Sequence, residues 1–321
     1  MHQFAYLFPG QGSQVVGMGQ ALAEAYPVAA ATFAEADAVL GFALSELCFD
    51  GPEETLNSTI NTQPALLVTS VAAWRAAEAA LGVLPRGLFV AGHSLGEYSA
   101  LVAAGALRFA DAVRLVRLRG QLMGQADDLQ PGGMAAILAL DDETVEQIVA
   151  DAAAQTGGVV QVANYNSPGQ VVISGDLPAL TAAMALAGGR GARKVVRLPI
   201  SIAAHSALMA PAAREMAAAL TETPVAEPQV PVISNITAQP LASAADIRRE
   251  LVDQLTAGVR WDQSVRLMAT AGVTAFVEFG SGTVLTALAK RIAPAPARLS
   301  VGDPTGIDQL NHLVQEVGAY D

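Results

Sequence analysis

The sequence has 321 residues and a single cysteine, Cys48. One cysteine excludes an internal disulfide framework and leaves no cysteine cluster for a metal site. We therefore expect Cys48 to be buried as a small apolar residue. Aromatic residues are also few, at 5% of the chain, although 52% of the residues are hydrophobic. The composition predicts a sizeable core that alanine, valine and leucine must fill.

Positive charge is scarce, with 18 Lys and Arg against 30 Asp and Glu and a net charge of −12. This balance argues against nucleic acid or an anionic membrane as the main partner. The chain also lacks an uncharged apolar run of about 18 residues, the length of a membrane span. The first ten residues contain no Lys or Arg, and their apolar stretch ends at Pro9-Gly10, unlike a signal peptide. We expect a cytoplasmic protein.

The strongest local pattern is Gly-x-Ser-x-Gly, from Gly92 to Gly96 with Ser94 at its centre. An apolar run over residues 88–91 predicts a strand before it, and small and apolar residues over 97–107 predict a helix after it. Between a strand and a helix this pattern predicts a nucleophile elbow, because the glycines let neighbouring backbone pass a sharp turn. The helix N-terminus behind the serine offers N–H groups for an oxyanion.

Strand and helix patterns alternate along most of the chain, which predicts an α/β fold with a mainly parallel sheet. Between Pro131 and Pro199 the predicted order is β-α-β-β-α-β, the order of a ferredoxin-like unit. We therefore predict a hydrolase-like body from residues 1–130 and 200–321, with an inserted ferredoxin-like subdomain at 131–199. The active site is expected in the cleft between them.

The individual elements follow from hydrophobic periodicity and turn residues. The predicted strands cover residues 3–8, 88–91, 134–140, 159–165, 170–174, 192–198, 230–235, 275–279 and 298–301. The main predicted helices cover residues 22–40, 64–81, 97–107, 109–127, 141–154, 177–187, 204–220, 244–255, 261–271, 284–291 and 307–320.

A serine nucleophile needs a base, and the chain has four histidines. His2 begins the first strand, at the edge of the sheet opposite the elbow. His93 is adjacent to Ser94, and neighbouring side chains on a strand point to opposite sides. His312 lies far away in the last predicted helix, although the sequence alone does not exclude it. By elimination His205 is the predicted base, at the point where the chain leaves the small subdomain.

No acidic residue stands out as a partner for His205. The acids between the serine and this histidine include Asp111, Asp127, Asp141 and Asp176, which lie at helix starts or turns. Helix capping explains residues in such positions. We therefore expect a Ser–His dyad whose histidine is held by a neutral oxygen.

Arg114, Arg117 and Arg119 share one predicted helix. At about 100° per residue, Arg119 points about 140° away from Arg114 and about 200° away from Arg117. Arg119 is therefore expected to face inward, where a buried arginine pairs with an anion. A substrate carboxylate in that role would select a dicarboxylic acyl group, and a structural salt bridge is the alternative.

Several motifs along the chain occur together, in the same order, in one enzyme family. They are residues 8–14 (FPGQGSQ), 92–101 (GHSLGEYSAL), 117–120 (RLRG), 164–175 (NYNSPGQVVISG), 205–209 (HSALM), 254–255 (QL), 259–261 (VRW) and 278–282 (EFGSG). With them the chain resembles the malonyl-CoA:acyl carrier protein transacylases of bacterial fatty-acid synthesis. It is also similar to the acyltransferase domains of polyketide synthases.

The resemblance implies a role for each catalytic residue. Ser94 would attack the thioester of malonyl-CoA, and His205 would transfer the proton. The backbone N–H groups of Gln11 and Leu95 would form the oxyanion hole. The backbone carbonyl of Gln254 would orient His205, in keeping with the missing acid.

The resemblance also implies how substrates bind. Arg119 would pair with the malonyl carboxylate, and Gln11, His93 and Asn164 would make further substrate contacts. The malonyl-serine ester would then react with the phosphopantetheine thiol of acyl carrier protein, in a ping-pong reaction. Malonyl-CoA and acyl carrier protein are the expected partners. A monomer without cofactor or metal is expected.

Three alternatives remain open at this stage. A serine hydrolase or thioesterase would share the nucleophile but would not need the arginine. A non-catalytic acyltransferase-like subunit of a larger synthase would not need Ser94 and His205. A trans-acting acyltransferase of a polyketide system would have the same chemistry and a different carrier.

A run of basic residues stands out in this acidic chain: Arg190, Arg193, Lys194 and Arg197. It could meet an acidic carrier protein or the CoA phosphates. A solvated strand edge that resists aggregation explains it equally well.

Overall fold

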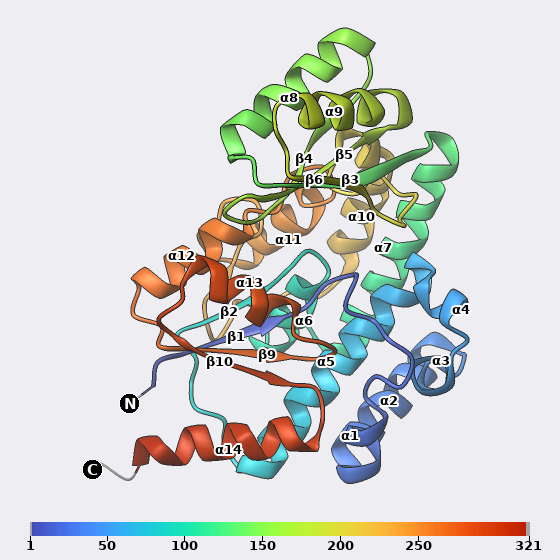
Figure 1. The fold of residues 1–321 in the computed structure, drawn as a ribbon. Helices are drawn as coiled ribbons and strands as arrows, with labels where there is room; N and C mark the ends of the chain where they lie inside the picture. Colours follow the sequence, from blue (N-terminus) through green and yellow to red (C-terminus); the bar gives the residue numbers. More distant parts are fainter. Residues whose placement is uncertain (1, 319–321) are drawn as a thin grey trace.

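The computed structural model describes residues 2–318 and contains two separate β-sheets (Figure 1). The larger sheet has six strands in the order β10-β9-β1-β2-β7-β8. Its strands are β1 (Phe4–Phe8), β2 (Phe89–Gly92), β7 (Val232–Ile233), β8 (Pro240–Leu241), β9 (Ala275–Phe279) and β10 (Ala297–Val301). All neighbouring pairs are parallel except β7 and β8. The predicted mainly parallel α/β body is confirmed.

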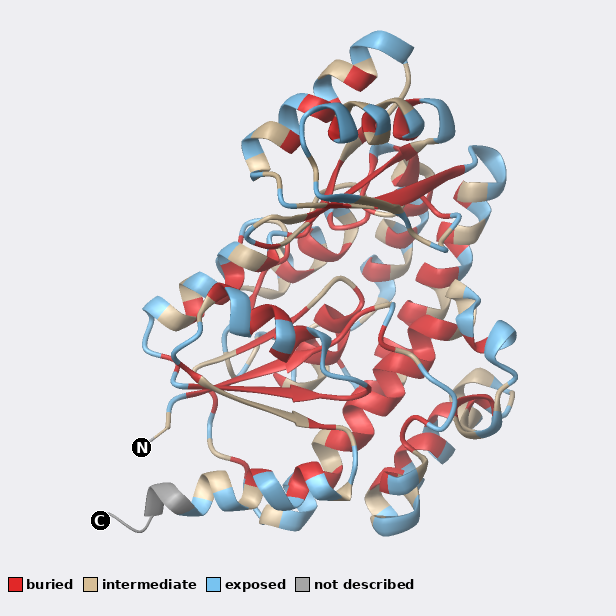
Figure 2. Ribbon diagram, viewed as in Figure 1, coloured by how far each residue is buried: buried red, intermediate tan, exposed pale blue. Residues whose placement is uncertain are grey.

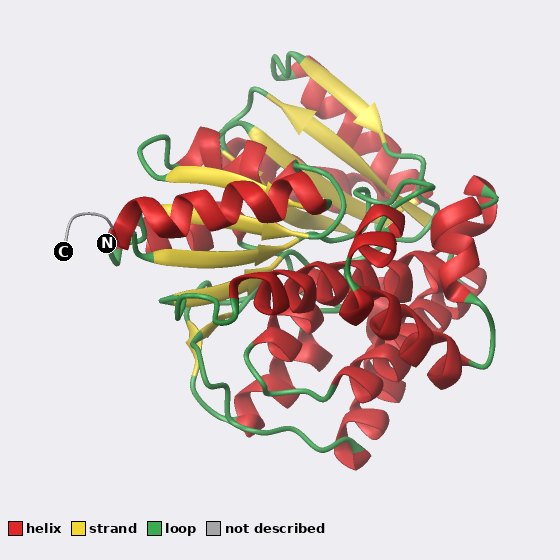
Figure 3. Cartoon of the chain, turned by 90° about the horizontal axis from the view of Figure 1, so that it is seen from below, coloured by secondary structure: helices red, strands yellow, loops and turns green. Residues whose placement is uncertain are grey.

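The central strand β1 is buried along its whole length, as expected for a parallel strand covered on both faces. Phe4, Tyr6 and Phe8 enter the main core, whereas Ala5 and Leu7 enter a smaller core on the opposite face. Figure 3 shows most of the helices gathered to one side of the larger sheet. This arrangement leaves the carboxyl ends of β1 and β2 free to carry the loops of a site.

Helices cover both faces of the larger sheet. On the face of the smaller core lie α12 (Trp261–Thr270) and α13 (Val284–Ile292). The main core is formed with α1 (Gln20–Ala25), α2 (Pro27–Leu40), α3 (Leu44–Asp50), α4 (Glu53–Asn57), α5 (Thr59–Leu81), α6 (Gly96–Ala103), α7 (Phe109–Leu129), α10 (Ala210–Glu222), α11 (Ala244–Asp253) and α14 (Pro304–Gly318). Cys48 in α3 is fully buried, as predicted. Within residues 2–318, no helix is both long and apolar enough to span a membrane.

The smaller sheet has four antiparallel strands in the order β4-β5-β3-β6. The elements are β3 (Gly132–Leu138), α8 (Asp142–Thr156), β4 (Val160–Ser167), β5 (Gln170–Asp176), α9 (Leu177–Gly189) and β6 (Lys194–Arg197). Their order is the predicted β-α-β-β-α-β order of a ferredoxin-like subdomain. In Figure 1 this subdomain lies above the larger sheet. The exact boundaries at 130/131 and 199/200 stay a prediction.

Helix α5 begins at Thr59, five residues before the predicted start at Pro64. Proline has no N–H to donate to the carbonyl four residues earlier, which is that of Ile60. The structure supplies another donor, because Arg117 Nη1 lies 2.9 Å from the Ile60 oxygen. A side chain from α7 thus allows α5 to continue through a proline. Figure 2 shows the buried residues along α5.

Other boundaries also differ from the prediction. The single helix predicted over 22–40 is broken at Tyr26, which is extended because Pro27 follows it. The strand predicted over 230–235 pairs only at Val232–Ile233 and then turns into the unpredicted strand β8. The helix predicted from 204 starts as a 3₁₀ turn at Ala207–Met209 and continues as α10. Of the predicted helix 307–320, residues 319 and 320 lie outside the described chain.

The turn between β2 and α6 is sterically closed to side chains at both glycines. A Cβ on Gly92 would overlap the backbone of Gly96, and a Cβ on Gly96 would overlap the carbonyl oxygen of Phe8. Ser94 between them has a φ of 52°, in the left-handed region. The Gly-x-Ser-x-Gly pattern therefore forms the predicted sharp turn, and its glycines are required by close backbone approach.

We expect Gly96→Ala to lower the free energy of unfolding by about 3 kcal/mol or more, because neither backbone segment can move away from the new Cβ. Urea denaturation measures this. Gly124→Ala in α7 is the matched control, since a Cβ there meets nothing within 4 Å. It should raise stability by about 0.5–1 kcal/mol. Equal stability of the two variants would contradict this reading of the turn.

Candidate active site

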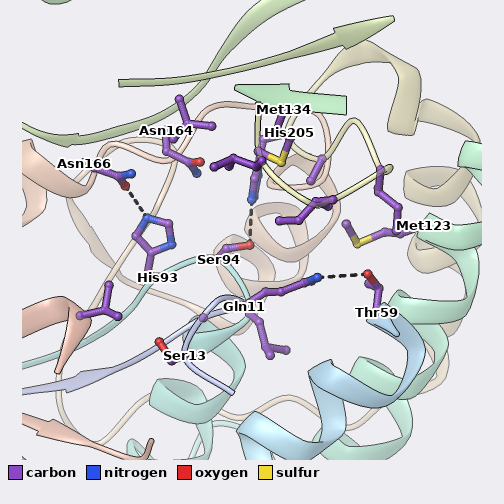
Figure 4. Close-up of a pocket in the computed structure, with 18 of the residues that line it drawn as sticks. Gln11, Ser13, Thr59, His93, Ser94, Met123, Met134, Asn164, Asn166 and His205 are labelled. Atoms are coloured by element: carbon purple, nitrogen blue, oxygen red, sulfur yellow. Dashed lines mark hydrogen bonds between the residues drawn. The ribbon is translucent and has the colours of Figure 1, made fainter. Parts of the chain in front are cut away.

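The structure brings the predicted nucleophile and base together at the carboxyl end of β2 (Figure 4). Ser94 Oγ lies 2.7 Å from His205 Nε2. The other ring nitrogen of His205, Nδ1, lies 2.8 Å from the carbonyl oxygen of Gln254 and 3.2 Å from that of Ala257. Carbonyl oxygens only accept, so Nδ1 carries the proton and Nε2 is left to accept the serine proton. The histidine is held by neutral oxygens, as the sequence predicts.

His205 is buried, with 3% of its surface exposed, and has a φ of 58°. Burial and then the positive charge of Arg119 lower the pKa of His205 from 6.5 to about 3. Both effects disfavour the imidazolium. The imidazole is therefore neutral at physiological pH, which is the form that a base requires.

Gln254 makes more contacts than its predicted backbone bond to His205. Its side-chain Nε2 donates to the carbonyl oxygen of Ser94 at 3.0 Å and also to Glu97 Oε2. Its side-chain Oε1 accepts from Arg119 Nη2 at 3.0 Å. One residue therefore touches the nucleophile's backbone, the base and the arginine. No local pattern indicates this role of the side chain, because its partners are remote along the chain.

Arg119 is 2% exposed and faces the site, whereas Arg114 on the same helix is exposed. Its Nη1 donates to Gln63 Oε1 at 2.9 Å, and its Nη2 also reaches Ser94 Oγ at 3.2 Å. Within residues 2–318, no carboxylate forms a salt bridge with Arg119, and its Nε has no hydrogen-bond partner. A buried cation held only by neutral acceptors can pair with a ligand anion.

Two backbone N–H groups are available for an oxyanion. The N–H of Ser94 itself is used, since it donates to Asn235 Oδ1 at 2.7 Å. In the part of the chain that the structure describes, the N–H groups of Gln11 and Leu95 have no hydrogen-bond partner, and both residues line the pocket. Asn235 also donates through Nδ2 to the Gly92 oxygen at 2.7 Å. It thereby clamps the turn, a role that the sequence did not reveal.

The pocket around Ser94 lies between the two sheets and has a volume of about 180 Å³. Gln11, His93 and Asn164, the residues expected to contact the substrate, are among its polar lining residues. The apolar part of its wall is formed by Met123, Met134, Val172, Leu198, Ile200, Ile202, Val284, Leu285 and Leu288. Arg119 also lines this pocket.

The expectation that His93 points away from Ser94 is wrong, because both residues line the same pocket. Strand β2 ends at Gly92, so the alternation of side chains no longer applies one residue later. His93 Nε2 lies 2.8 Å from Asn166 Oδ1 (Figure 4). The other two histidines lie elsewhere: His2 contacts Thr274, and His312 is exposed on α14.

Three of the basic residues singled out in the sequence, Arg193, Lys194 and Arg197, lie on or next to β6, the edge strand of the smaller sheet, and Arg190 directly follows α9. Arg193, Lys194 and Arg197 are exposed. Arg190 pairs with Asp151 of α8. Three of the four charges are thus displayed to solvent along an open sheet edge.

The site combines a serine on a strained turn and a neutral histidine within hydrogen-bond distance. The same pocket is lined by two residues whose N–H groups have no partner in the described chain. These are the parts of a serine enzyme that forms an acyl intermediate. The added feature is a buried arginine at the nucleophile. The fold and the site therefore define the class of this protein: an α/β acyl-transfer enzyme with a site for an acidic acyl group.

Comparison with known proteins agrees with this class and narrows it. A family model described as "Acyl transferase domain" matches residues 5–297. The chain is 46% identical over 307 residues to the malonyl CoA-acyl carrier protein transacylase of Salmonella typhimurium, covering 96% of this chain and 98% of that protein. It is 45% identical over 316 residues to the enzyme of the same name from Bacillus subtilis, covering 98% of each.

Solved structures give the same result. An acyl carrier protein S-malonyltransferase from Vibrio cholerae superposes with a TM-score of 0.92 at 47% identity, covering 96% of this chain and 99% of that one. The malonyl CoA-acyl carrier protein transacylase of Coxiella burnetii gives 0.93 at 40% identity, covering 97% of both chains. The chain belongs to the malonyl CoA-acyl carrier protein transacylase family.

We expect acylation of Ser94 by an uncharged ester, p-nitrophenyl acetate, to lose no rate between about pH 8 and pH 5, because the pKa of His205 is lowered to about 3. Removing the charge of Arg119 with Arg119→Leu raises this pKa. The rate should then fall at a higher pH than in the wild type. A stopped-flow pH profile measures both.

Arg114→Leu, an exposed residue on the same helix, is the control and should keep the wild-type profile. A wild-type acid limb centred near pH 6.5, the ordinary histidine pKa, would contradict the assignment.

Proposed function

We propose that this protein transfers the malonyl group of malonyl-CoA to the phosphopantetheine thiol of acyl carrier protein, for fatty-acid synthesis, through a malonyl ester of Ser94. One observation carries the proposal: Ser94 Oγ lies 2.7 Å from the base His205 and 3.2 Å from Arg119 Nη2. A base and a carboxylate-binding cation thus converge on one oxygen. Relatives that bear the name of this activity cover nearly the whole chain.

In the first half-reaction Ser94 Oγ gives its proton to His205 Nε2 and attacks the thioester carbonyl carbon of malonyl-CoA. The N–H groups of Gln11 and Leu95 donate to the oxyanion that forms. The tetrahedral intermediate then expels the CoA sulfur, which takes the proton from His205. The carbonyl oxygen of Gln254 stabilises the imidazolium through Nδ1–H while it lasts.

The second half-reaction repeats these steps with the carrier as nucleophile. The thiol of the phosphopantetheine arm gives its proton to His205 and attacks the ester carbonyl. Ser94 Oγ leaves and takes the proton back. Because the malonyl group is held on Ser94 as a covalent ester, CoA leaves before the carrier reacts, which gives ping-pong kinetics.

Arg119 selects the acyl group in this proposal. In the described part of the chain, its hydrogen-bond acceptors are neutral oxygens of Gln63, Gln254 and Ser94. A malonyl carboxylate offers this buried cation an ionised partner, whereas an acetyl group does not. His93, Asn164 and Gln11 contact the rest of the acyl group in this proposal, which is supported by their position in the lining of the pocket.

The domain division belongs to the same proposal. A body of residues 1–130 and 200–321 carries the dyad, and residues 131–199 close the pocket from the other side. The pocket's lining supports this division, because Met134, Asn164 and Val172 come from the smaller sheet. We place the protein in the cytoplasm, where bacterial fatty-acid synthesis takes place, and propose that it acts as a monomer.

A carrier protein of polyketide synthesis is a second candidate acceptor. The chain is 42% identical over 296 residues to a polyketide biosynthesis protein of Burkholderia thailandensis, covering 92% of this chain and 25% of that protein. A solved complex of a malonyl-transacylase with a type II polyketide carrier superposes with a TM-score of 0.93 at 43% identity. The chemistry at Ser94 is the same for either carrier.

Intact-protein mass spectrometry after mixing with malonyl-CoA should show a malonyl adduct on the wild type and none on Ser94→Ala. Addition of holo acyl carrier protein should move the adduct to the carrier. Fatty-acid and polyketide carriers, compared at equal concentration, identify the preferred acceptor. Loss of the adduct to water at the same rate with or without a carrier would indicate a thioesterase. No adduct at all would favour a non-catalytic subunit.

Arg119→Ala should lower malonyl transfer and raise the relative use of acetyl groups. Loss of a charge-assisted pair corresponds to about 1.5–3 kcal/mol of discrimination. Competition between malonyl-CoA and acetyl-CoA, read as the ratio of adduct masses, measures it. An unchanged ratio would remove Arg119 as the residue that selects the acyl group.

A further inference from the structure

Glu97 is a fully buried carboxyl in the first turn of α6, directly after the nucleophile turn. Its Oε1 accepts from the backbone N–H of Asn235 at 3.1 Å, and its Oε2 accepts from Gln254 Nε2. It is not among the residues that line the pocket around Ser94. The proposed mechanism does not use this carboxyl group, although burying a carboxyl group costs free energy of folding.

The contacts of the Gln254 side chain allow only one orientation of its amide. The NH2 group faces two acceptors, the Ser94 carbonyl oxygen and the Glu97 carboxyl. The oxygen faces a donor, Arg119 Nη2. If the amide turned over, its NH2 group would meet the guanidinium and its oxygen would meet two acceptors. Glu97 and the Ser94 carbonyl, both acceptors, therefore hold the amide with its oxygen toward Arg119.

We infer that Glu97 is a positioning residue for acyl-group selection, because through the Gln254 amide it holds Arg119 beside Ser94. This inference rests on the proposed function, in which Arg119 binds the malonyl carboxylate. Glu97 acts on the malonyl group without contacting it. A neutral acyl group, which does not use Arg119, is insensitive to this orientation.

The charges around Glu97 are consistent with this role. The neighbouring buried carboxyl is Glu250, whose oxygens accept from Ser234 Oγ at 2.6 Å and from the Ile236 N–H at 3.1 Å. Burial, and then the charge of Glu250, raise the pKa of Glu97 well above its ordinary value. In either protonation state each Glu97 oxygen keeps a lone pair for its N–H donor. The orientation of Gln254 is therefore maintained without a fixed charge.

The test is Glu97→Gln, which keeps the shape but replaces one oxygen by an NH2 group. That group must face either the Asn235 N–H, which cannot turn, or the Gln254 amide, which can. Opposed by that NH2 group, the Gln254 amide is either displaced or turned over, and in both cases its hydrogen bond with Arg119 is weakened or lost. We expect malonyl transfer to fall about 10- to 100-fold, the range for a lost hydrogen bond to a charged group. Acetylation of Ser94 by p-nitrophenyl acetate should fall less than about threefold.

Gln254→Met is a second variant, which removes the same amide but keeps the backbone carbonyl that holds His205. It should lower the malonyl-to-acetyl ratio as Glu97→Gln does, and the double variant should be no worse than either single variant. If Glu97→Gln does not fold, Gln254→Met still tests whether the amide that Glu97 contacts controls acyl-group selection. Additive effects, an unchanged ratio, or equal loss of both activities would overturn the inference.

Glu278→Gln is the matched control for removing a buried carboxylate. Glu278 is fully buried and accepts from the N–H groups of Leu285 and Thr286, and none of its described hydrogen bonds involves Gln254 or Arg119. Its loss should lower the melting temperature without changing the malonyl-to-acetyl ratio. If the wild type forms no malonyl adduct, the proposed function fails and the inference with it. If the wild type forms the malonyl adduct but Glu97→Gln and Gln254→Met keep the wild-type malonyl-to-acetyl ratio, the inference about Glu97 is wrong and the proposed function stands.

Discussion

The set of hydrogen bonds made by Gln254 is the constraint on which the rest of the site depends. Its backbone oxygen fixes the tautomer of His205, and its side chain joins the Ser94 backbone to Arg119. Nucleophile, base and arginine come from three distant parts of the chain, and each needs a position defined within tenths of an ångström. A single residue at the end of α11 connects all three. A displacement of α11 would therefore disturb the proton transfer and the arginine together.

The site also stores backbone strain. Ser94 and His205 both adopt positive φ, at 52° and 58°, which residues with a Cβ rarely do. The surrounding contacts offset this cost: Asn235 binds both the Ser94 N–H and the Gly92 oxygen. The left-handed turns direct the two side chains at each other. Strain at these two positions is thus part of how the dyad is assembled.

The smaller sheet is bonded to the segment that holds the base. The N–H of Tyr165 in β4 donates to the Val259 oxygen at 2.9 Å, and the N–H of Val259 donates to the Ala163 oxygen at 2.8 Å. Gln161 donates to the Thr256 oxygen at 3.0 Å and accepts from the Ala207 N–H at 3.1 Å. The loop that bears the acceptors of His205 is therefore part of the interface between the two sheets. These bonds explain how Ser94 and His205 keep their relative positions in a pocket that is lined by both sheets.

The sequence by itself determined the features that depend on neighbouring residues. The Gly-x-Ser-x-Gly turn, the order of strands and helices, and the inward direction of Arg119 follow from local sterics and from periods of two and 3.6 residues. The pairing of Ser94 with His205 could be reached by elimination, because only four histidines were available.

Only the tertiary structure decided the rest, because it depends on contacts between residues far apart in the chain. The Gln254 amide, the Asn235 clamp and the buried Glu97 carry no local signature, since their partners lie more than a hundred residues away. His93 lines the pocket because strand β2 ends at Gly92, so the alternation of side chains along the strand does not extend to His93. Helix α5 runs through Pro64 because Arg117 satisfies the carbonyl that the proline leaves free. Local patterns specify elements, whereas hydrogen-bond partners are chosen by the packing of those elements.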